Sequence, residues 1–233
     1  MANHKIKSKK DTNITVIIPS AGEGRRMKSY GPKSLIALTK ENILQRQIRI
    51  VNKILDNVSF IMVAGFDCDK LMDSCPDYFL KLENESYDIT NVSRSIALAL
   101  RAVKTERVLI VYGDLVFNEL ALSRMDYSTS CTSASNDKYR QHEVGCIVDA
   151  DGNITNMMYD LETKWNQIIY LEGKELHLFK KECQERKNKK LFGFEILNKV
   201  IDRGGKIKCI VDNSIEVVDI DTSKDLLRAN NIR

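Results

Sequence analysis

Residues 16–27 read VIIPSAGEGRRM, and Pro32 and Lys33 follow after a short spacer. The run at 16–18 consists of β-branched residues, which favour a buried strand. The strand runs directly into a loop that contains glycine, arginine and, a little later, lysine. We therefore predict a strand that ends in a ligand-binding loop. Other site residues are expected to lie near this loop.

The composition of this loop suits a phosphate group. Gly22 and Gly24 permit a tight turn in which successive backbone N–H groups can bind an anion. Arg25, Arg26 and Lys33 add full positive charges, and the planar fork of arginine matches phosphate oxygens. The competing interpretation is an ordinary strand–turn–helix whose charges are solvated.

Two familiar phosphate-binding loops do not match. A P-loop requires G-x-x-x-x-G-K-[ST], and no lysine follows a second glycine at that spacing. The dinucleotide fingerprint G-x-G-x-x-G requires a third glycine, and Met27 stands at that position. The loop therefore belongs to another class.

Residues 21–27 followed by Pro32-Lys33 resemble the signature of the nucleotidyltransferases, or NTP-dependent pyrophosphorylases, roughly A-G-x-G-[ST]-R-[ML] and then P-K. Arg25 replaces the usual Ser or Thr, which removes a hydroxyl contact and adds charge. The resemblance covers about residues 14–231. It implies that the loop binds the nucleotide through Ala21, Gly22, Gly24 and Arg25, with Lys33 and Arg26 as catalytic residues.

Length and composition favour one globular domain. The chain has 233 residues, of which 43% are hydrophobic and 29% charged, with a formal net charge of +4. We expect residues 1–13 to form a disordered basic tail and 14–233 a single nucleotidyltransferase domain. No second basic stripe with interleaved aromatic residues is present, so nucleic acid is not an expected partner.

The cysteines and the apolar runs indicate the compartment. The six cysteines form no C-x-x-C pair, so a zinc site is not expected and the thiols are predicted to be buried and reduced. No run approaches 18 apolar residues and the first residues are polar. We expect a cytoplasmic protein without membrane contact, and the sequence leaves a homodimer open.

The chain alternates between strand and helix patterns. Strands are predicted at 15–19, 59–64, 79–82, 107–112, 129–134, 144–149, 154–158, 167–171 and 215–219. Helices are predicted at 41–56, 67–74, 92–104, 118–124, 174–187, 192–203 and 222–230. The βαβα order predicts an α/β fold with a Rossmann-like mixed, mostly parallel sheet, similar to the glycosyltransferase-A fold. Asp151-Gly152 between two apolar runs predicts a hairpin, and hence a small antiparallel insertion.

An aspartate follows the predicted core strand 107–112. Ligands of open α/β sheets bind beyond the carboxyl ends of the strands, and Asp114 occupies such an end. Gly113 leaves room for a ligand, and a carboxylate suits Mg²⁺. The resemblance implies that Asp114 binds the metal; a helix-capping role is the alternative.

A second acidic site lies near the C-terminus. Asp219 and Asp221 are two residues apart, so on a strand they face the same side. The resemblance implies that one of them is a second metal ligand, and the sequence does not choose between them. Asp221 has an alternative role as the N-cap of the last helix, with Asp225 in its first turn.

Three further residues are assigned by resemblance. Asn91 and Ser95 open the helix 92–104 in a pattern similar to bacterial choline-phosphate cytidylyltransferases, which implies a place near the nucleotide. A capped amphipathic helix explains the same residues. Gly65 follows the strand 59–64, where the family lines its base pocket; a turn glycine is the alternative.

Residues 143–149 and the aromatic residues Tyr159, Trp165 and Tyr170 fall where related proteins build the acceptor pocket. Aromatic rings with acidic groups can enclose a quaternary ammonium by cation–π attraction. They can equally form core or oligomer contacts.

These observations together predict a Mg²⁺-dependent nucleotidyltransferase. It would transfer NMP, with CMP favoured, from an NTP to a small phosphorylated acceptor such as phosphocholine or a sugar 1-phosphate, and release pyrophosphate. One alternative is a metal-dependent glycosyltransferase that uses a sugar nucleotide, which would lack the loop and its lysine. Another is a non-catalytic nucleotide-binding regulator, which would tend to lose Lys33 or the aspartates.

Overall fold

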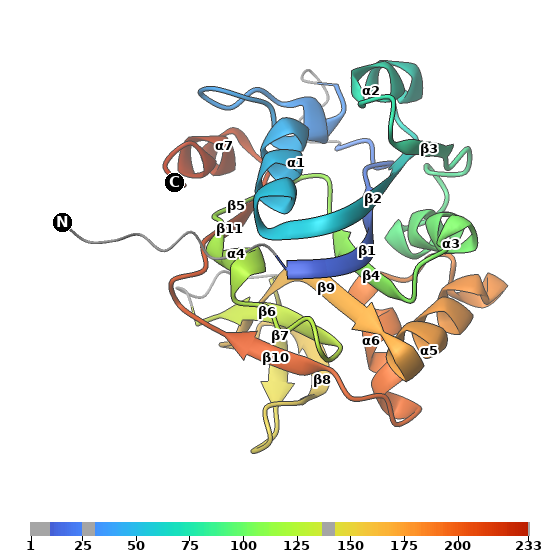
Figure 1. The fold of residues 1–233 in the computed structure, drawn as a ribbon, viewed down its shortest axis with the longest axis vertical. Coiled ribbons are helices and arrows are strands. Elements are labelled where there is room, and N and C mark those ends of the chain that lie inside the picture. The colour runs from blue at the N-terminus through green and yellow to red at the C-terminus, as the bar shows by residue number, and fades with distance from the viewer. Residues whose placement is uncertain (1–9, 25–30, 137–142, 233) are drawn as a thin grey trace.

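The computed structural model describes residues 10–24, 31–136 and 143–232, with residues 10–12 described by their backbone alone (Figure 1). The main sheet has the strand order β10-β6-β9-β4-β1-β2-β3. These strands are β1 (Lys10–Pro19), β2 (Leu55–Ala64), β3 (Leu80–Glu83), β4 (Arg107–Val111), β6 (Cys131–Ser135), β9 (Lys164–Glu172) and β10 (Lys208–Val211).

Most neighbours in the main sheet are parallel, as predicted. Strands β4, β1, β2 and β3 run parallel, as do β10 and β6, while β9 runs antiparallel between β4 and β6. A hairpin of β7 (Val144–Val148) and β8 (Ile154–Tyr159) attaches to β9. The predicted turn at Asp151-Gly152 joins its strands, with Gly152 at a φ of 77°. The predicted α/β class with a small antiparallel insertion is confirmed.

Helices cover both faces of the sheet. Successive side chains of β1 point to opposite faces, and its apolar residues are buried on both. Ile14, Val16 and Ile18 belong to one buried cluster, with side chains from α1 (Ile43–Ile54), α2 (Cys68–Ser74) and α4 (Leu120–Ser123). Ile17 belongs to the opposite cluster. Its helices are α3 (Val92–Ala102), α5 (Gly173–Gln184) and α6 (Gly193–Asp202). Among the described helices, none combines the length and the apolar character needed to span a lipid bilayer.

A two-stranded antiparallel sheet completes the fold. It pairs β5 (Leu115–Phe117) with β11 (Val217–Asp219), and α7 (Ser223–Ala229) follows. Val116, Val218 and Ile220 are buried together with Ile36 and Ile43 in a third apolar cluster. The C-terminal segment is therefore packed against the same part of the molecule as the start of α1.

Every predicted helix and strand is present, with three differences. Strand β1 begins at Lys10 and pairs there with β2, so residues 10–13 form a strand instead of the predicted disordered tail. Residues 1–9 lie outside the described part of the chain. Strands β5 and β10 were not predicted, because three- and four-residue runs carry too little periodicity to be recognised.

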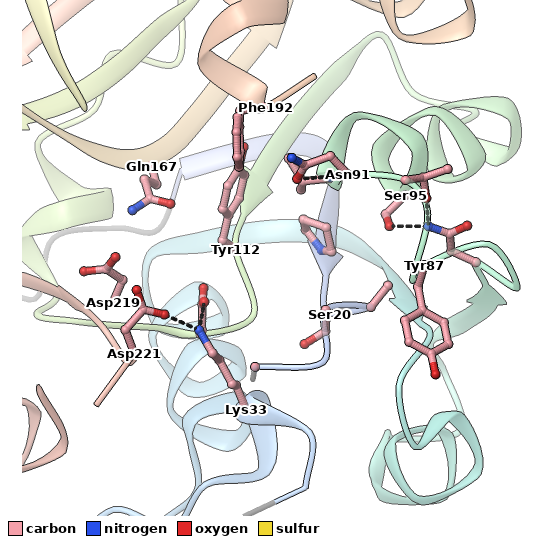
Figure 2. A pocket seen from close by; sticks show the side chains of 18 residues that line it. Ser20, Lys33, Tyr87, Asn91, Ser95, Tyr112, Gln167, Phe192, Asp219 and Asp221 are labelled. Carbon is pink, nitrogen blue, oxygen red and sulfur yellow. Dashed lines mark hydrogen bonds and ion pairs between the residues drawn. The ribbon is translucent and has the colours of Figure 1, made fainter. Parts of the chain in front are cut away.

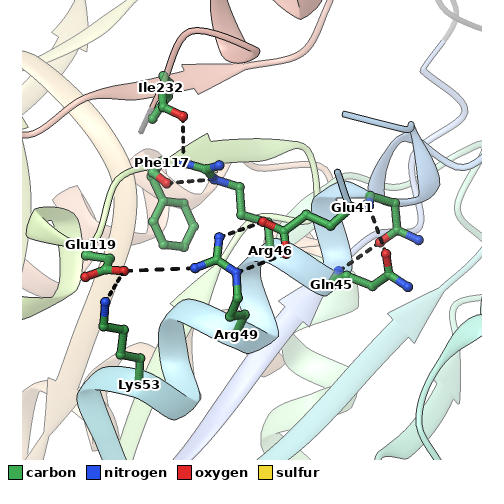
Figure 3. A network of polar contacts seen from close by, with 9 residues as sticks. Glu41, Gln45, Arg46, Arg49, Lys53, Phe117, Glu119 and Ile232 are labelled. Carbon is green, nitrogen blue, oxygen red and sulfur yellow. Dashed lines mark hydrogen bonds and ion pairs between the residues drawn. The ribbon is translucent and has the colours of Figure 1, made fainter. Parts of the chain in front are cut away.

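The exposed face of α1 carries a polar network that reaches the C-terminal segment (Figure 3). Arg46 Nε donates to the Phe117 carbonyl at 3.1 Å, and its Nη2 donates to the Ile232 carbonyl at 3.0 Å. Arg49, half exposed, pairs with Glu41 at 2.6 Å. Because Arg46 joins β5 to the last residues, it holds the C-terminal segment against α1.

We expect Arg46→Met to lower the free energy of unfolding by about 2–3 kcal/mol, because two carbonyls lose a charged donor. Arg49→Met on the same helix should cost less than about 1 kcal/mol, because its ion pair is solvated. Urea denaturation of both variants measures the difference. Equal losses would show that Arg46 contributes no more than a surface charge.

Candidate active site

A cavity of about 330 Å³ opens where the parallel strands β1, β2, β3 and β4 end (Figure 2). Residues that follow β1, β3 and β4 line it, as expected for an open α/β sheet. Most of the predicted site residues line this cavity. They are Ala21, Gly22, Gly24, Lys33, Asn91, Ser95, Asp114, Asp219 and Asp221.

Three predicted site residues are not among the lining residues. Arg25 and Arg26 lie outside the described residues. Gly65 lies close to residues that line the cavity but does not line it: a Cβ there would lie 2.7 Å from the Ala21 carbonyl oxygen and 2.8 Å from the Cβ of Tyr87. The absence of a side chain at Gly65 therefore lets the end of β2 pack closely against the loop, and its predicted contact with a base stays a prediction.

We expect Gly65→Ala to destabilise the protein by about 1–3 kcal/mol, because backbone atoms on the opposite side cannot move freely. Gly22→Ala, in the loop that Gly65 packs against, is the matched control, since a Cβ at Gly22 meets no atom within 4 Å. It should change stability by less than about 0.5 kcal/mol. Thermal unfolding of the two variants tests the assignment; equal shifts would refute it.

Lys33 projects from the short 3₁₀ helix η2 (Lys33–Leu35) into the cavity. Its aliphatic stem lies against Gly24, where a Cβ would approach the Lys33 Cε and Cγ to 3.0 Å. Its Nζ donates to Asp221 Oδ1 at 2.6 Å and to Asp114 Oδ2 at 3.0 Å. Burial acts to lower the pKa of Lys33, but the two carboxylates outweigh burial and raise the pKa well above its ordinary value. Lys33 is therefore a fixed cation between two carboxylates.

The backbone around Asp114 is held from two sides. A Cβ at Gly113 would overlap the Ser20 side chain, so only glycine lets β4 end this close to the loop. On the other side, Gln47 Nε2 donates to the carbonyls of Tyr112 and Leu115 at 2.9 and 2.8 Å. Gln47 is buried in α1 and gave no recognisable sequence signal.

Pairing of β11 with β5 brings the late aspartates to Asp114. Asp219 lies opposite Leu115, and the N–H of Ile220 donates to the Asp114 carbonyl at 3.0 Å. Thr222, not Asp221, is the N-cap of α7, so the alternative role of Asp221 does not hold. Burial raises the pKa of Asp219, and Asp114 and Asp221 add to the shift against the opposing charge of Lys164.

Polar residues from β3 and α3 form the opposite wall. Asn91 caps α3, with its Oδ1 accepting from the Val92 N–H at 2.8 Å, as predicted. Asn84 Nδ2 donates to the hydroxyls of Ser95 and Thr90 at 3.1 and 3.2 Å. Asn84 was missed, although it directly follows a predicted strand, as Asp114 does. The strand-end rule applied to β3 would have found it.

A second cavity of about 240 Å³ adjoins the first. Its walls are rich in aromatic rings: Tyr159 lies edge-on to Phe194 with centroids 5.4 Å apart, and Phe192 stacks on Phe194 at 6.1 Å. The two cavities share five wall residues. These are Tyr112, Gln167, Phe192, Asp219 and Asp221.

The second cavity contains part of the segment predicted for an acceptor. Glu143, Tyr159 and Trp165 line it, and Lys164 pairs with Glu143 at 2.7 Å. Tyr170 does not: it is fully buried, and its hydroxyl donates to the Glu172 carboxylate at 2.6 Å. Tyr170 therefore belongs to the core, as the alternative interpretation stated.

The carboxylates form a donor set that fits a hard divalent cation. Asp114, Asp219 and Asp221 supply only oxygen ligands, and the Lys33 ammonium already shows two of them converging on one cation. In the described part of the chain, no three His, Cys, Asp or Glu side chains lie close enough together to hold a metal ion by themselves, the three aspartates included. The set suits a metal such as Mg²⁺, which takes its other ligands from phosphates and water.

Comparison with known proteins identifies related folds. A family model described as a MobA-like NTP transferase domain matches residues 16–147. No curated protein sequence gives a significant match.

Among solved structures, the CTP:phosphocholine cytidylyltransferase of Streptococcus pneumoniae is 14% identical, with a TM-score of 0.75 over 93% of this chain and 97% of that one. The inositol-1-phosphate CTP transferase of T. maritima is 16% identical, with a TM-score of 0.76 over 97% and 99%. A UDP-glucose pyrophosphorylase bound to UDP-glucose is 12% identical, with a TM-score of 0.73 over 93% and 97%. At these identities the likeness shows a shared fold.

Proposed function

Because the chain belongs to the MobA-like NTP transferase family, we propose that it is a Mg²⁺-dependent nucleotidyltransferase that transfers CMP from CTP to phosphocholine or a similar small phosphate. The observation that carries this proposal is the junction of two cavities. The phosphate-binding loop and Lys33 line the first, aromatic rings line the second, and Asp219 and Asp221 belong to both. A nucleotide in the first cavity and an acceptor in the second would meet at the carboxylates.

The reaction requires positioning and charge neutralisation from the protein. A phosphate oxygen of the acceptor attacks the α-phosphorus of CTP in line, the bond to the bridging oxygen breaks, and pyrophosphate leaves. That oxygen is already anionic near neutral pH, so no general base is required. Lys33 neutralises charge at the α-phosphate, and the backbone N–H groups of residues 21–24 orient the departing phosphates.

Asp114, with Asp219 or Asp221, would hold Mg²⁺ beside these phosphates. Within the described residues, Asp219 has no ion-pair partner, whereas Asp221 contacts Lys33 at 2.6 Å. When bound, the metal supplies a further positive charge on the phosphate oxygens. Lys33 and a cation held by the carboxylates would together neutralise the negative charge of the phosphates.

The second cavity favours a cationic acceptor. Tyr159, Trp165 and Phe194 line it and Asp219 adds a carboxylate, whereas the charge of Glu143 is balanced by Lys164 at 2.7 Å. Aromatic and acidic groups in one enclosed site bind a quaternary ammonium such as that of phosphocholine. A sugar 1-phosphate would instead require several polar partners for its hydroxyl groups.

The choice of CMP is supported by two of the compared structures, whose names describe cytidylyltransferases. A glycosyltransferase, the alternative class, needs no lysine at the phosphate loop. A non-catalytic regulator needs neither Lys33 nor Asp114, and this chain keeps both in contact at 3.0 Å.

Pyrophosphate release tests the proposal directly. Four NTPs are each combined with phosphocholine, aminoethylphosphonate and several sugar 1-phosphates in the presence of Mg²⁺. We expect the highest kcat/KM for CTP with phosphocholine. Release at background level for every pair would refute the enzymatic function, and a preference for a sugar 1-phosphate would refute the cationic acceptor.

Removal of divalent metal should abolish turnover. We expect excess EDTA to reduce pyrophosphate release to background, because Lys33 alone leaves the charge of the triphosphate largely unneutralised. Added Mg²⁺ in excess of EDTA should restore the rate. Undiminished turnover after exhaustive chelation would contradict the role given to the three aspartates.

A further inference from the structure

Gln167 has a strained backbone in the middle of β9. Its φ is 59°, in the left-handed region that residues other than glycine, Asn and Asp seldom adopt. Strained residues persist where the surrounding structure holds them, and they cluster at functional sites. Gln167 lies on the shared wall of both cavities, so its strain occurs where the two ligands would meet.

A bulge in β9 produces this conformation. Thr132 of β6 pairs with Ile169 and Ala134 pairs with Trp165, so one residue of β6 lies opposite three of β9. The bulge is anchored at both ends by one side chain. Thr132 Oγ1 donates to the Ile168 carbonyl at 2.5 Å and accepts from Trp165 Nε1 at 2.7 Å. Bulges of this kind redirect a side chain out of the regular alternation of a strand.

The redirected side chain is free to bind a ligand. Gln167 is half-buried, and no hydrogen bond connects its amide to any described residue. Figure 2 shows Gln167 on the same side of the cleft as Asp219 and Asp221. On the shared wall, the amide and the buried Tyr112 hydroxyl are uncharged polar groups, beside two carboxylates that would repel a phosphate.

We propose that Gln167 is a specificity-determining residue that donates an Nε2–H hydrogen bond to the phosphate of the acceptor, an inference that rests on the proposed function. The acceptor phosphate must enter the shared wall to reach the α-phosphorus. Lys33 is already engaged by Asp114 and Asp221, so the acceptor needs a further donor there. A neutral amide supplies one and forms no ion pair with the neighbouring carboxylates.

The test is steady-state kinetics with CTP, phosphocholine and Mg²⁺ on Gln167→Gly, Gln167→Glu and Gln167→Asn. Gly removes the amide and relieves the backbone, so the melting temperature should stay equal or rise while the KM for phosphocholine rises about tenfold or more. Glu has the same shape without the N–H and adds repulsion, so its KM should exceed that of Gly. Asn keeps an amide and tolerates positive φ, so its KM should lie between wild type and Gly.

Asn57→Gly is the matched control, because Asn57 has a φ of 54° in β2 and lines neither cavity. It should relieve strain without changing either KM. A phosphocholine KM for Gln167→Gly within twofold of wild type would overturn the inference, as would a KM for Gln167→Glu no higher than for Gly, or a change confined to the KM for CTP. Inactivity of the wild type itself would instead refute the proposed function.

Discussion

Lys33→Met lowers kcat by about 10²–10³-fold in a protein that remains folded, if Lys33 neutralises the α-phosphate as proposed. Its ammonium lies 2.6 Å from Asp221 and 3.0 Å from Asp114, on the stem that Gly24 accommodates. Methionine keeps the length and the contact with Gly24 and removes only the charge. Pyrophosphate release under saturating CTP and acceptor measures the loss.

The stability cost of this substitution should be small. Asp114 and Asp221 would face each other without a cation, but their side chains are 28% and 48% exposed and water solvates them. We expect a loss below about 2 kcal/mol. Lys40→Met is the control, because Lys40 is exposed and the charge change is the same. If Lys33→Met retained the wild-type kcat, the assignment of the loop to the triphosphate would be wrong.

We expect Asp114→Asn to lower activity by a similar factor, because it removes a proposed metal ligand. The substitution is isosteric and leaves Lys33 paired with Asp221, so the fold should be unaffected. It removes the carboxylate that follows β4, next to the backbone that Gln47 holds, and a lost ligand worth about 4 kcal/mol lowers kcat/KM by about 10³-fold.

The Mg²⁺ dependence of activity separates this role from a purely electrostatic one. Asp114→Asn should need a much higher Mg²⁺ concentration for half-maximal rate, whereas Lys33→Met should not. Asp202→Asn, at the exposed end of α6, is the matched control and should match wild type in both measurements. An unchanged Mg²⁺ requirement in Asp114→Asn would exclude it as a ligand.

The sequence predicted the candidate site best where its residues directly follow a recognisable strand. Gly22 and Gly24 follow the strand 16–18, and Asp114 follows the strand 107–112. Because ligands of open α/β sheets bind beyond the carboxyl ends of the strands, the sequence placed these residues around one cavity. Prediction was limited where contacts are distant in sequence. The pairing of β5 with β11 decides how Asp219 and Asp221 reach Asp114, and two three-residue strands carry no pattern that reveals it.

Other features depend on backbone geometry that a single sequence does not display. The sequence offers Gly65 as a turn glycine and predicts that Gly113 leaves room for a ligand, yet at both positions another segment of the chain lies where a Cβ would be. Gln167 reads as an ordinary strand residue, and only the register between β6 and β9 shows the bulge. The roles of Arg25 and Arg26 stay predictions.

The ion pair between Lys33 and Asp221 joins residues 188 positions apart. During translation the chain emerges from the ribosome N-terminal end first, so the loop, Lys33 and Asp114 are exposed well before β11 exists. Until residue 221 has been synthesised and β11 has paired with β5, Asp219 and Asp221 cannot join Asp114 at the proposed metal site. The site can therefore be complete only after β11 has been synthesised, and a ribosome-bound fragment ending before β11 should have no turnover.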